Sequence, residues 1–324
     1  MRRLTGLLIG LAVLWGGYWF IGSTAVEKGM TTWFSESTFD GLDVTYSELE
    51  TRGFPNRFDT TITDIDLTHR QSGTHWTAPF FQLFALSYKP NHLIAVWPNE
   101  QTLDVAGQVF DITSDDLRGS LVLEPNTSLT LDRTALEAEN LTVTPVGTAP
   151  WNVTRAFIAT RQTPEAEASH DLSVALEELT LPPYLTAVLD PEGTLPPAIS
   201  GLTVDATLDL TAPINRESLD VDLTRVTFRD ATIRWGDLSL GVSGELEADA
   251  LGFAEGSLTL NADNWREVFR ILATANLVDP IWEGAIAPLA ETDGNPDTLT
   301  TSLTFDRGVL YFGPLALGDA PRLN

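Results

Sequence analysis

Apolar and polar residues alternate along most of this chain, and the alternation is most regular at residues 201–210. Every even position from Leu202 to Leu210 is apolar, and every odd position between them is threonine or aspartate. Successive side chains of a strand point to opposite faces, so this pattern predicts a strand with one apolar face and one acidic, hydrated face. Because similar alternation recurs from residue 42 onward, the predicted fold class is mainly β, with long antiparallel, curled β-sheets.

Breaks in the alternation indicate where strands end. In the C-terminal half the pattern predicts strands at residues 202–210, 219–228, 232–240, 242–248 and 256–260. The apolar phase shifts after Leu223, which predicts a β-bulge at Thr224 and Arg225.

Glycine and proline mark two further turns. Residues 42–50 and 57–69 are predicted to form a hairpin around Gly53 and Pro55. Gly313 and Pro314 are predicted to form a second turn, and both turns are expected to fix strand register.

One segment, residues 264–277, has a helical pattern. Apolar side chains recur there at the spacing of one helix face, at Trp265, Val268, Phe269 and Leu272. Asn264 in front, with Glu267 three residues later, matches a capping box. Shorter helices are predicted at residues 184–189 and 281–289.

The amino terminus predicts a membrane anchor. Residues 4–21 carry no charge and are mostly apolar, and they follow Arg2 and Arg3. This is about the length that a helix needs to cross the hydrocarbon core of a bilayer. Positive residues favour the cytoplasmic side. We therefore expect a single-pass inner-membrane protein, anchored by residues 1–22, with a cytoplasmic N-terminus and the bulk of the chain in the periplasm.

The end of this segment and the residues that follow it set the expected divisions of the chain. Trp15, Tyr18 and Trp19 suit the membrane interface on the far side from the arginines. Small residues at 23–25 match a signal-peptidase site, which leaves a cleaved signal peptide as the alternative to an anchor. Residues 23–40 are predicted to be a neck. A proline pair at 196–197 is taken as the boundary between two β regions, 41–197 and 198–324.

Several short motifs resemble a known family. They are RGFPNRFD at 52–59, SYKPNH at 87–92, VWP at 96–98, NWREVF at 264–269, GNPD at 294–297 and FGP at 312–314. In these motifs the chain resembles, over essentially its whole length, the alphaproteobacterial proteins grouped as domain-of-unknown-function family 2125. The resemblance implies one membrane anchor and a large periplasmic region, and it supplies no catalytic residues. The overall plan is also similar to that of AsmA-like envelope proteins, which are associated with phospholipid traffic.

Composition and motifs exclude several functional classes. A formal net charge of −26 argues against a nucleic-acid partner. The chain has no cysteine, so it has no disulfide and no thiolate site. Phosphate-binding, dinucleotide-binding, zinc-protease and serine-hydrolase motifs are absent from the sequence. Because the four histidines are scattered, we expect no metal, no cofactor and no enzymatic activity.

Long sheets with one apolar face need something to cover that face, and few helices are predicted. The apolar faces either close on one another in a sandwich or barrel, or they hold a foreign molecule in a groove. The candidate groove-lining residues come from an aromatic stretch that alternates poorly and from a nearby tryptophan: Phe80, Phe81, Leu83, Phe84 and Trp97.

The function expected from these patterns is binding of lipid or another amphiphile in a β-sheet groove, for maintenance of the cell envelope. The alternative is a periplasmic scaffold with a closed β-sandwich core and no ligand, which binds protein partners whose nature the sequence leaves open.

Overall fold

The computed structural model describes residues 2–37, 41–164, 166–276, 278–292, 295–312 and 315–323. Strands make up 57% of the chain and helices 19%, which confirms the mainly β class. The paired strands among the described residues are antiparallel. Gly313 and Pro314, which were predicted to form a turn, lie outside the described residues.

The chain packs into two compact units, and each is described here by itself. Unit 1 comprises Met1–Pro125 and Leu136–Thr148, and unit 2 comprises Asn126–Ala135 and Ala149–Asn324. Pro197, the predicted boundary between β regions, lies inside unit 2 in the connection between α2 and β12.

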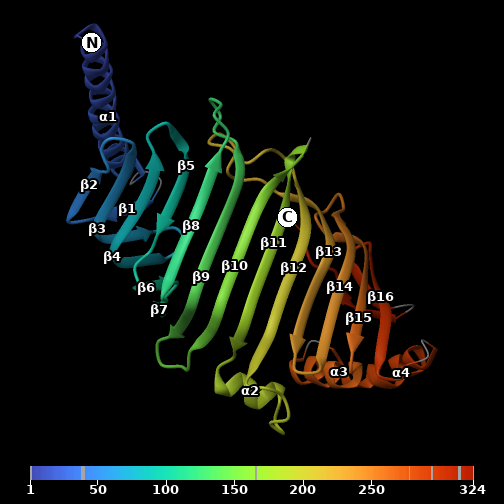
Figure 1. Cartoon of the computed structure of the whole chain (residues 1–324). Helices are drawn as coiled ribbons and strands as arrows, with labels where there is room; N and C mark the ends of the chain where they lie inside the picture. The colour runs from blue at the N-terminus through green and yellow to red at the C-terminus, as the bar shows by residue number, and fades with distance from the viewer. Residues whose placement is uncertain are drawn as a thin grey trace. The chain divides into compact units, whose positions relative to one another are not determined.

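Unit 1 contains one long helix and a set of antiparallel strands (Figure 1). Its elements are α1 (Arg2–Ser37), β1 (Leu42–Thr45), β2 (Glu48–Arg52), β3 (Arg57–His69), β4 (Thr74–Leu86), β5 (Lys89–Val96), β6 (Glu100–Val105), β7 (Gln108–Thr113), β8 (Asp116–Leu123) and β9 (Leu131–Pro145) from Leu136 onward. A small core joins the end of the helix to β3 and β4 through Phe34, Ile62, Ile65 and Ala78.

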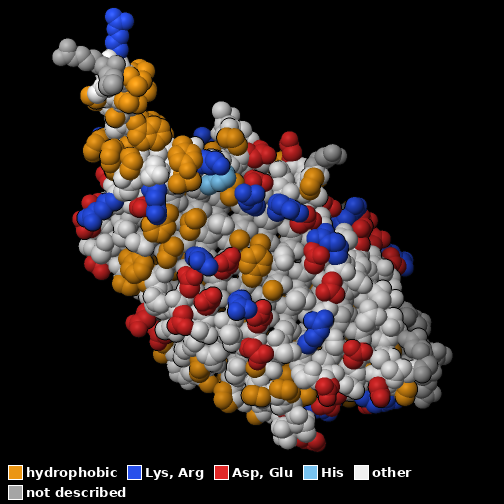
Figure 2. Space-filling view, in the orientation of Figure 1, with side chains coloured by type: hydrophobic (Ala, Val, Ile, Leu, Met, Phe, Trp, Pro, Cys, Tyr) orange, Lys and Arg blue, Asp and Glu red, His pale blue; other side chains and the backbone are white. Residues whose placement is uncertain are grey.

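Helix α1 runs without a break from Arg2, in the predicted anchor, to Ser37 in the predicted neck, and residues 38–40 of that neck lie outside the described residues. Among the described residues it is the one helix that is long and apolar enough to cross a membrane, over Arg3–Glu36. Hydrophobic side chains cover its N-terminal part (Figure 2). Leu8, Val13 and Leu14 are between 58% and 72% exposed, as expected for a surface that faces lipid.

Unit 2 is a meander in which each strand pairs with the next along the chain. Its elements are β10 (Trp151–Thr163), β11 (Ala166–Thr180), α2 (Pro183–Leu189), β12 (Ala198–Leu210), β13 (Leu223–Trp235), β14 (Leu238–Ala248), β15 (Ala254–Asp263), α3 (Trp265–Thr274), η2 (Pro280–Trp282), α4 (Glu283–Thr292), β16 (Thr298–Asp306), β17 (Val309–Phe312) and β18 (Leu315–Asp319). Helices α2, α3 and α4 lie at the same end of these strands (Figure 1).

Strand β13 corrects the predicted division of residues 219–240 into two strands. It runs without a turn from Leu223 to Trp235, and the hairpin turns instead at Gly236 and Asp237. Arg229 and Asp230, where the apolar alternation breaks, form a bulge that shifts the register against β14. The bulge predicted at Thr224 is confirmed, because the register against β12 passes from Arg225 to Leu223.

Helix α3 forms as predicted, but its predicted capping box is wrong. Asn264 has a left-handed backbone with φ of 51°, and its side chain does not cap the helix. Its Nδ2 atom instead donates to the carbonyl of Asp237 at 2.8 Å. Glu267 is occupied by an ion pair with Arg270. The helix ends at Thr274, and Leu277, the predicted last residue, lies outside the described residues.

Candidate functional site

The sheet of unit 2 has one apolar face. The strand register places Leu202 beside Ile233, and Val204 beside Ala231. The same row continues from Val204 into Val174 of β11. Neighbouring strands therefore place their apolar residues on the same face of the sheet.

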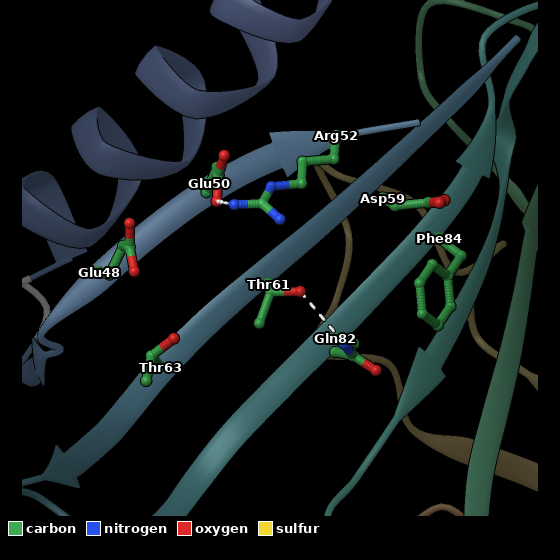
Figure 3. A pocket seen from close by; sticks show the side chains of 8 residues that line it. All are labelled: Glu48, Glu50, Arg52, Asp59, Thr61, Thr63, Gln82 and Phe84. Atoms are coloured by element: carbon green, nitrogen blue, oxygen red, sulfur yellow. Dashed lines mark hydrogen bonds and ion pairs between the residues drawn. The ribbon is translucent and has the colours of Figure 1, made fainter. Parts of the chain in front are cut away.

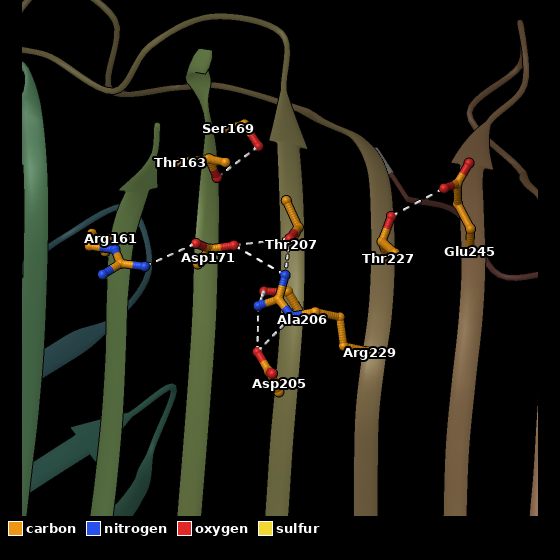
Figure 4. Close-up of polar contacts among 10 residues, drawn as sticks. All are labelled: Arg161, Thr163, Ser169, Asp171, Asp205, Ala206, Thr207, Thr227, Arg229 and Glu245. Atoms are coloured by element: carbon orange, nitrogen blue, oxygen red, sulfur yellow. Dashed lines mark hydrogen bonds and ion pairs between the residues drawn. The ribbon is translucent and has the colours of Figure 1, made fainter. Parts of the chain in front are cut away.

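The opposite face of the same sheet is polar. Arg229, from the bulge in β13, reaches across β12 to β11 and contacts Asp205, Thr207 and Asp171 (Figure 4). Arg161 also lies 3.4 Å from Asp171. This network ties four neighbouring strands together on their hydrated side.

The carboxylates of this network have altered acidity. Partial burial alone would raise the pKa of Asp171, but hydrogen bonds from Thr207, Arg229 and Arg161 hold it below its usual value. The hydrogen bond from Arg229 also lowers the pKa of Asp205. Both groups are therefore stabilised as carboxylates, and we assign the network to strand registration.

Helix α3 covers one end of the apolar face. Trp265, Val268 and Phe269 are buried, with Trp265 only 1% exposed. The Trp265 indole donates to the carbonyl of Pro296 at 3.1 Å, which fixes the ring at the start of the helix. Phe269 packs with Ile286 of α4 and Leu299 of β16, so both helices rest on the same end of the sheet.

An apolar cavity of about 230 Å³ remains between these helices and the strands. Its lining comes from three parts of unit 2. Strands β14 to β16 contribute Leu240, Leu260, Ala262, Leu299, Thr301 and Leu303. The helices and the segment between them contribute Trp265, Val268, Phe269, Leu272, Val278, Trp282 and Ile286, and the last two strands contribute Leu310, Phe312 and Leu317. Thr301 supplies the single polar side chain among these described residues. Because the lining offers few polar partners, the cavity suits an apolar guest better than a polar one.

The other end of the apolar face is covered by the C-terminal segment. Ala320 packs with Ala206, Val226 and Leu246, and Leu323 lies against the same cluster. Backbone hydrogen bonds from Ala254 to Pro321 and from Leu323 to Gly252 hold the segment in place. The apolar face is thus tightly covered at this end, whereas the helix-covered end retains a cavity.

The sequence-predicted groove residues lie in unit 1, and the structure separates them. In β4, Phe81 is paired with Ile62, and Phe80 with Thr63, so the two rings point to opposite faces. Phe81 contacts Trp76 and Trp97, with ring centroids 5.7 and 5.3 Å apart.

The two remaining predicted residues are divided in the same way. Leu83 shares the face of Phe81, and Phe84 shares the face of Phe80. Phe84 borders a polar hollow of about 390 Å³ (Figure 3). Its other lining residues are Glu48, Glu50, Arg52, Asp59, Thr61, Thr63 and Gln82. The five residues therefore do not line a common groove.

Metal binding is not indicated by the described side chains. They contain no group of three or more histidines and carboxylates placed to hold a metal. His69 contacts Ser72 at 2.7 Å, and His75 contacts Asp66 at 3.1 Å. These are local contacts beside turns.

His170 is different, because it lies on the apolar face beside Leu208 and is 2% exposed. Neither of its ring nitrogens has a hydrogen-bond partner among the described residues. Burial lowers the pKa of His170, so the neutral ring is favoured.

Sequence reasoning found the helix and strands that build the cavity but missed the cavity. The signal available was the apolar face of α3 together with the apolar positions of β14 to β16. Their meeting depends on tertiary packing.

A comparison with known protein families gives a match over most of the chain. The model of a family described as "Uncharacterized protein conserved in bacteria" matches residues 19–321. No curated protein and no solved structure gives a significant match to the chain.

Proposed function

The chain belongs to domain-of-unknown-function family 2125 (DUF2125), and we propose that it is a non-enzymatic, inner-membrane-anchored periplasmic protein that binds the apolar tail of a lipid or another amphiphile. The cavity beneath α3 and α4 is the observation that carries this proposal. We expect this binding to serve the maintenance of the cell envelope.

Membrane anchoring is supported by α1. Apart from the buried Trp19, its large apolar residues from Leu4 to Ile21 remain exposed, with Ile21 at 74%. The positive charges of Arg2 and Arg3 favour a cytoplasmic N-terminus. The candidate signal-peptidase site lies inside the continuous helix, and Ser23 is only 6% exposed, which supports retention of the anchor over cleavage.

Amphiphile binding is supported by the chemistry of the cavity. Its walls are aliphatic and aromatic, and Thr301 is the one polar lining side chain among the described residues. Such walls give a polar molecule no compensation for its lost hydration, whereas an alkyl chain gains about 0.8 kcal/mol per buried methylene group. A single alkyl tail is the guest that best fits this balance.

Photocrosslinking tests the proposal. The full-length protein in nanodiscs would be irradiated with a diazirine-bearing palmitic acid, and the labelled peptides identified by mass spectrometry. We expect adducts on the lining residues of α3 and β16. Labelling restricted to α1, with none around the cavity, would contradict amphiphile binding.

Topology can be tested separately, because the chain has no native cysteine. A Val146→Cys variant places a thiol at an exposed position of unit 1, where the native side chain is 57% exposed. A membrane-impermeant maleimide should label it once the outer membrane is permeabilised and the inner membrane left intact. Labelling that requires disruption of the inner membrane would contradict a periplasmic location.

A further inference from the structure

Three aromatic side chains of α1 bind two loops of unit 1. The indole of Trp15 donates to the carbonyl of Pro55 at 2.8 Å, and the indole of Trp19 donates to that of Arg57 at 2.7 Å. The hydroxyl of Tyr18 donates to the carbonyl of Ser87 at 2.5 Å. The loop between β2 and β3 and the loop between β4 and β5 are thereby held against one turn of the helix.

The position of these contacts along α1 determines how deep the two loops lie in the membrane. From Arg3 to Trp15 the helix rises only about 18 Å, whereas the hydrocarbon core is about 30 Å thick. A span that starts beside Arg3 must therefore include Trp15 and Trp19 and end close to Ile21. The loops contact the helix inside this span.

The exposed residues of α1 indicate the same membrane depth for the loops. At the level of the loops, Phe20 and Ile21 are still 63% and 74% exposed. The first charged residue after the span is Glu27, whose carboxylate accepts a hydrogen bond from the backbone of Thr51 at 2.8 Å. The surroundings of α1 therefore become polar only after the turns that hold the loops.

The backbone of the two loops is prepared for a medium with little water. Besides the three carbonyls bound by α1, the carbonyl of Gly53 accepts from the amide of Arg57, and that of Asn56 accepts from the amide of Ser87. Irregular backbone is tolerated next to hydrocarbon only where such groups are satisfied by the protein.

Each loop leaves one aromatic side chain exposed, and the first loop also exposes Pro55 and Asn56. Phe54 is 56% exposed and stacks on Phe20, with ring centroids 5.9 Å apart. Tyr88 is also 56% exposed and precedes Lys89, which is exposed as well. Aromatic rings beside a basic residue are typical of the layer where acyl chains meet phospholipid headgroups.

We propose that these two loops are seated in the interfacial layer of the leaflet next to unit 1, with Phe54 and Tyr88 in direct contact with phospholipid. The inference rests on the proposed function for one point, that α1 spans the membrane. Unit 1 is then held at the bilayer by two loops as well as by its helix, which fixes its orientation.

Depth-dependent quenching of single-site labels tests the proposal. Phe54→Cys, Tyr88→Cys, Leu8→Cys and Val146→Cys variants would each be labelled with an environment-sensitive fluorophore in the full-length protein. They would be reconstituted in nanodiscs of phosphatidylethanolamine and phosphatidylglycerol. Leu8 reports on the span itself, and Val146 is an exposed control in the same unit.

We expect lipid-borne quenchers to act on the labels at Phe54 and Tyr88 several-fold more strongly than on the label at Val146. Labels at both loop positions that behave like Val146, while the label at Leu8 is deeply buried, would overturn the loop proposal and leave the anchor intact. A Leu8 label accessible to aqueous quencher would overturn the anchor and the loop proposal together.

Discussion

Gly22 of α1 lies directly against the ring of Phe58 in β3. A methyl group built on Gly22 would come within 2.6 Å of the Phe58 Cζ atom. Phe58 is itself only 6% exposed, so its ring has little room to move. The absence of a side chain at position 22 therefore allows the helix to approach the strand closely.

A Gly22→Leu substitution should force α1 away from β3. Overpacking of this kind typically costs about 1–3 kcal/mol. We expect faster tryptic cleavage after Arg52 and Arg57 in the nanodisc-bound protein, because the loop between β2 and β3 is released.

Gly17→Leu is the matched control for this prediction, since nothing lies within 4 Å of a methyl group built on Gly17. Equal cleavage rates for the two variants would show that the contact between Gly22 and Phe58 does not hold the loop.

Filling the cavity should block the proposed guest. Leu260→Phe adds volume inside the cavity, and its effect on stability should stay within about 1.5 kcal/mol because the cavity has space for it. We expect several-fold weaker labelling by the diazirine-bearing palmitic acid, measured on peptides of α3 and β16.

The control for cavity filling is Thr259→Phe, which adds a ring on the opposite face of the same strand. If both variants lost labelling equally, or if neither lost it, the cavity would not be the binding site.

Burial of His170 should make unit 2 sensitive to mild acid. The pKa of His170 is lowered in the folded protein, whereas the unfolded chain binds the proton near the ordinary value of 6.5. The unfolded state therefore holds more protons in this range, and stability should fall as the pH drops below about 6.5. His170→Leu should remove this dependence and raise the urea midpoint at pH near 5, with a gain on the order of 1 kcal/mol.

His75→Gln serves as the comparison for His170, because the His75 side chain is 44% exposed. That variant should retain the acid sensitivity of the wild type. A wild-type urea midpoint that stays constant between about pH 7 and pH 5 would contradict the assignment.

Removing Arg229 should weaken the polar network on the other face. Arg229→Gln should lower stability near neutral pH by no more than about 1 kcal/mol, because the Arg229 side chain is 43% exposed and its ion pairs are screened by water. The pKa values of Asp171 and Asp205 are lowered in the folded state, so their contribution is present above the ordinary value of 3.8 and is lost as the pH falls below it.

The difference between wild type and Arg229→Gln, measured as a urea midpoint, should therefore shrink below about pH 4. Arg307→Gln is the control, since its side chain is 84% exposed and pairs only with the adjacent Asp306 among the described residues. An unchanged difference at acid pH would exclude the two carboxylates as the cause.

Local patterns predicted much of the β architecture, because a two-residue period identifies a strand wherever one face is buried. Residues 202–210 fall within β12, and the phase change at Thr224 is a bulge as expected. The sequence of Arg229 and Asp230 resembled a turn because charge and lost alternation mark turns and bulges alike. The actual turn, at Gly236 and Asp237, follows Trp235, an apolar residue that fitted the predicted strand at 232–240.

The cavity was beyond prediction for a different reason. Leu260, Phe269 and Leu299 each show only that one side is buried, and no local pattern says which buried sides meet. Asn264 carried a valid capping signal, but its side chain bonds instead to Asp237, a partner distant along the chain.

The nearly uniform walls around Thr301 have a consequence for selectivity. A guest lodged among them finds no charge and no second hydroxyl from the described lining residues, so its head must remain outside. If an amphiphile binds here as we propose, the lining discriminates by the length and width of its tail and gives no preference among heads.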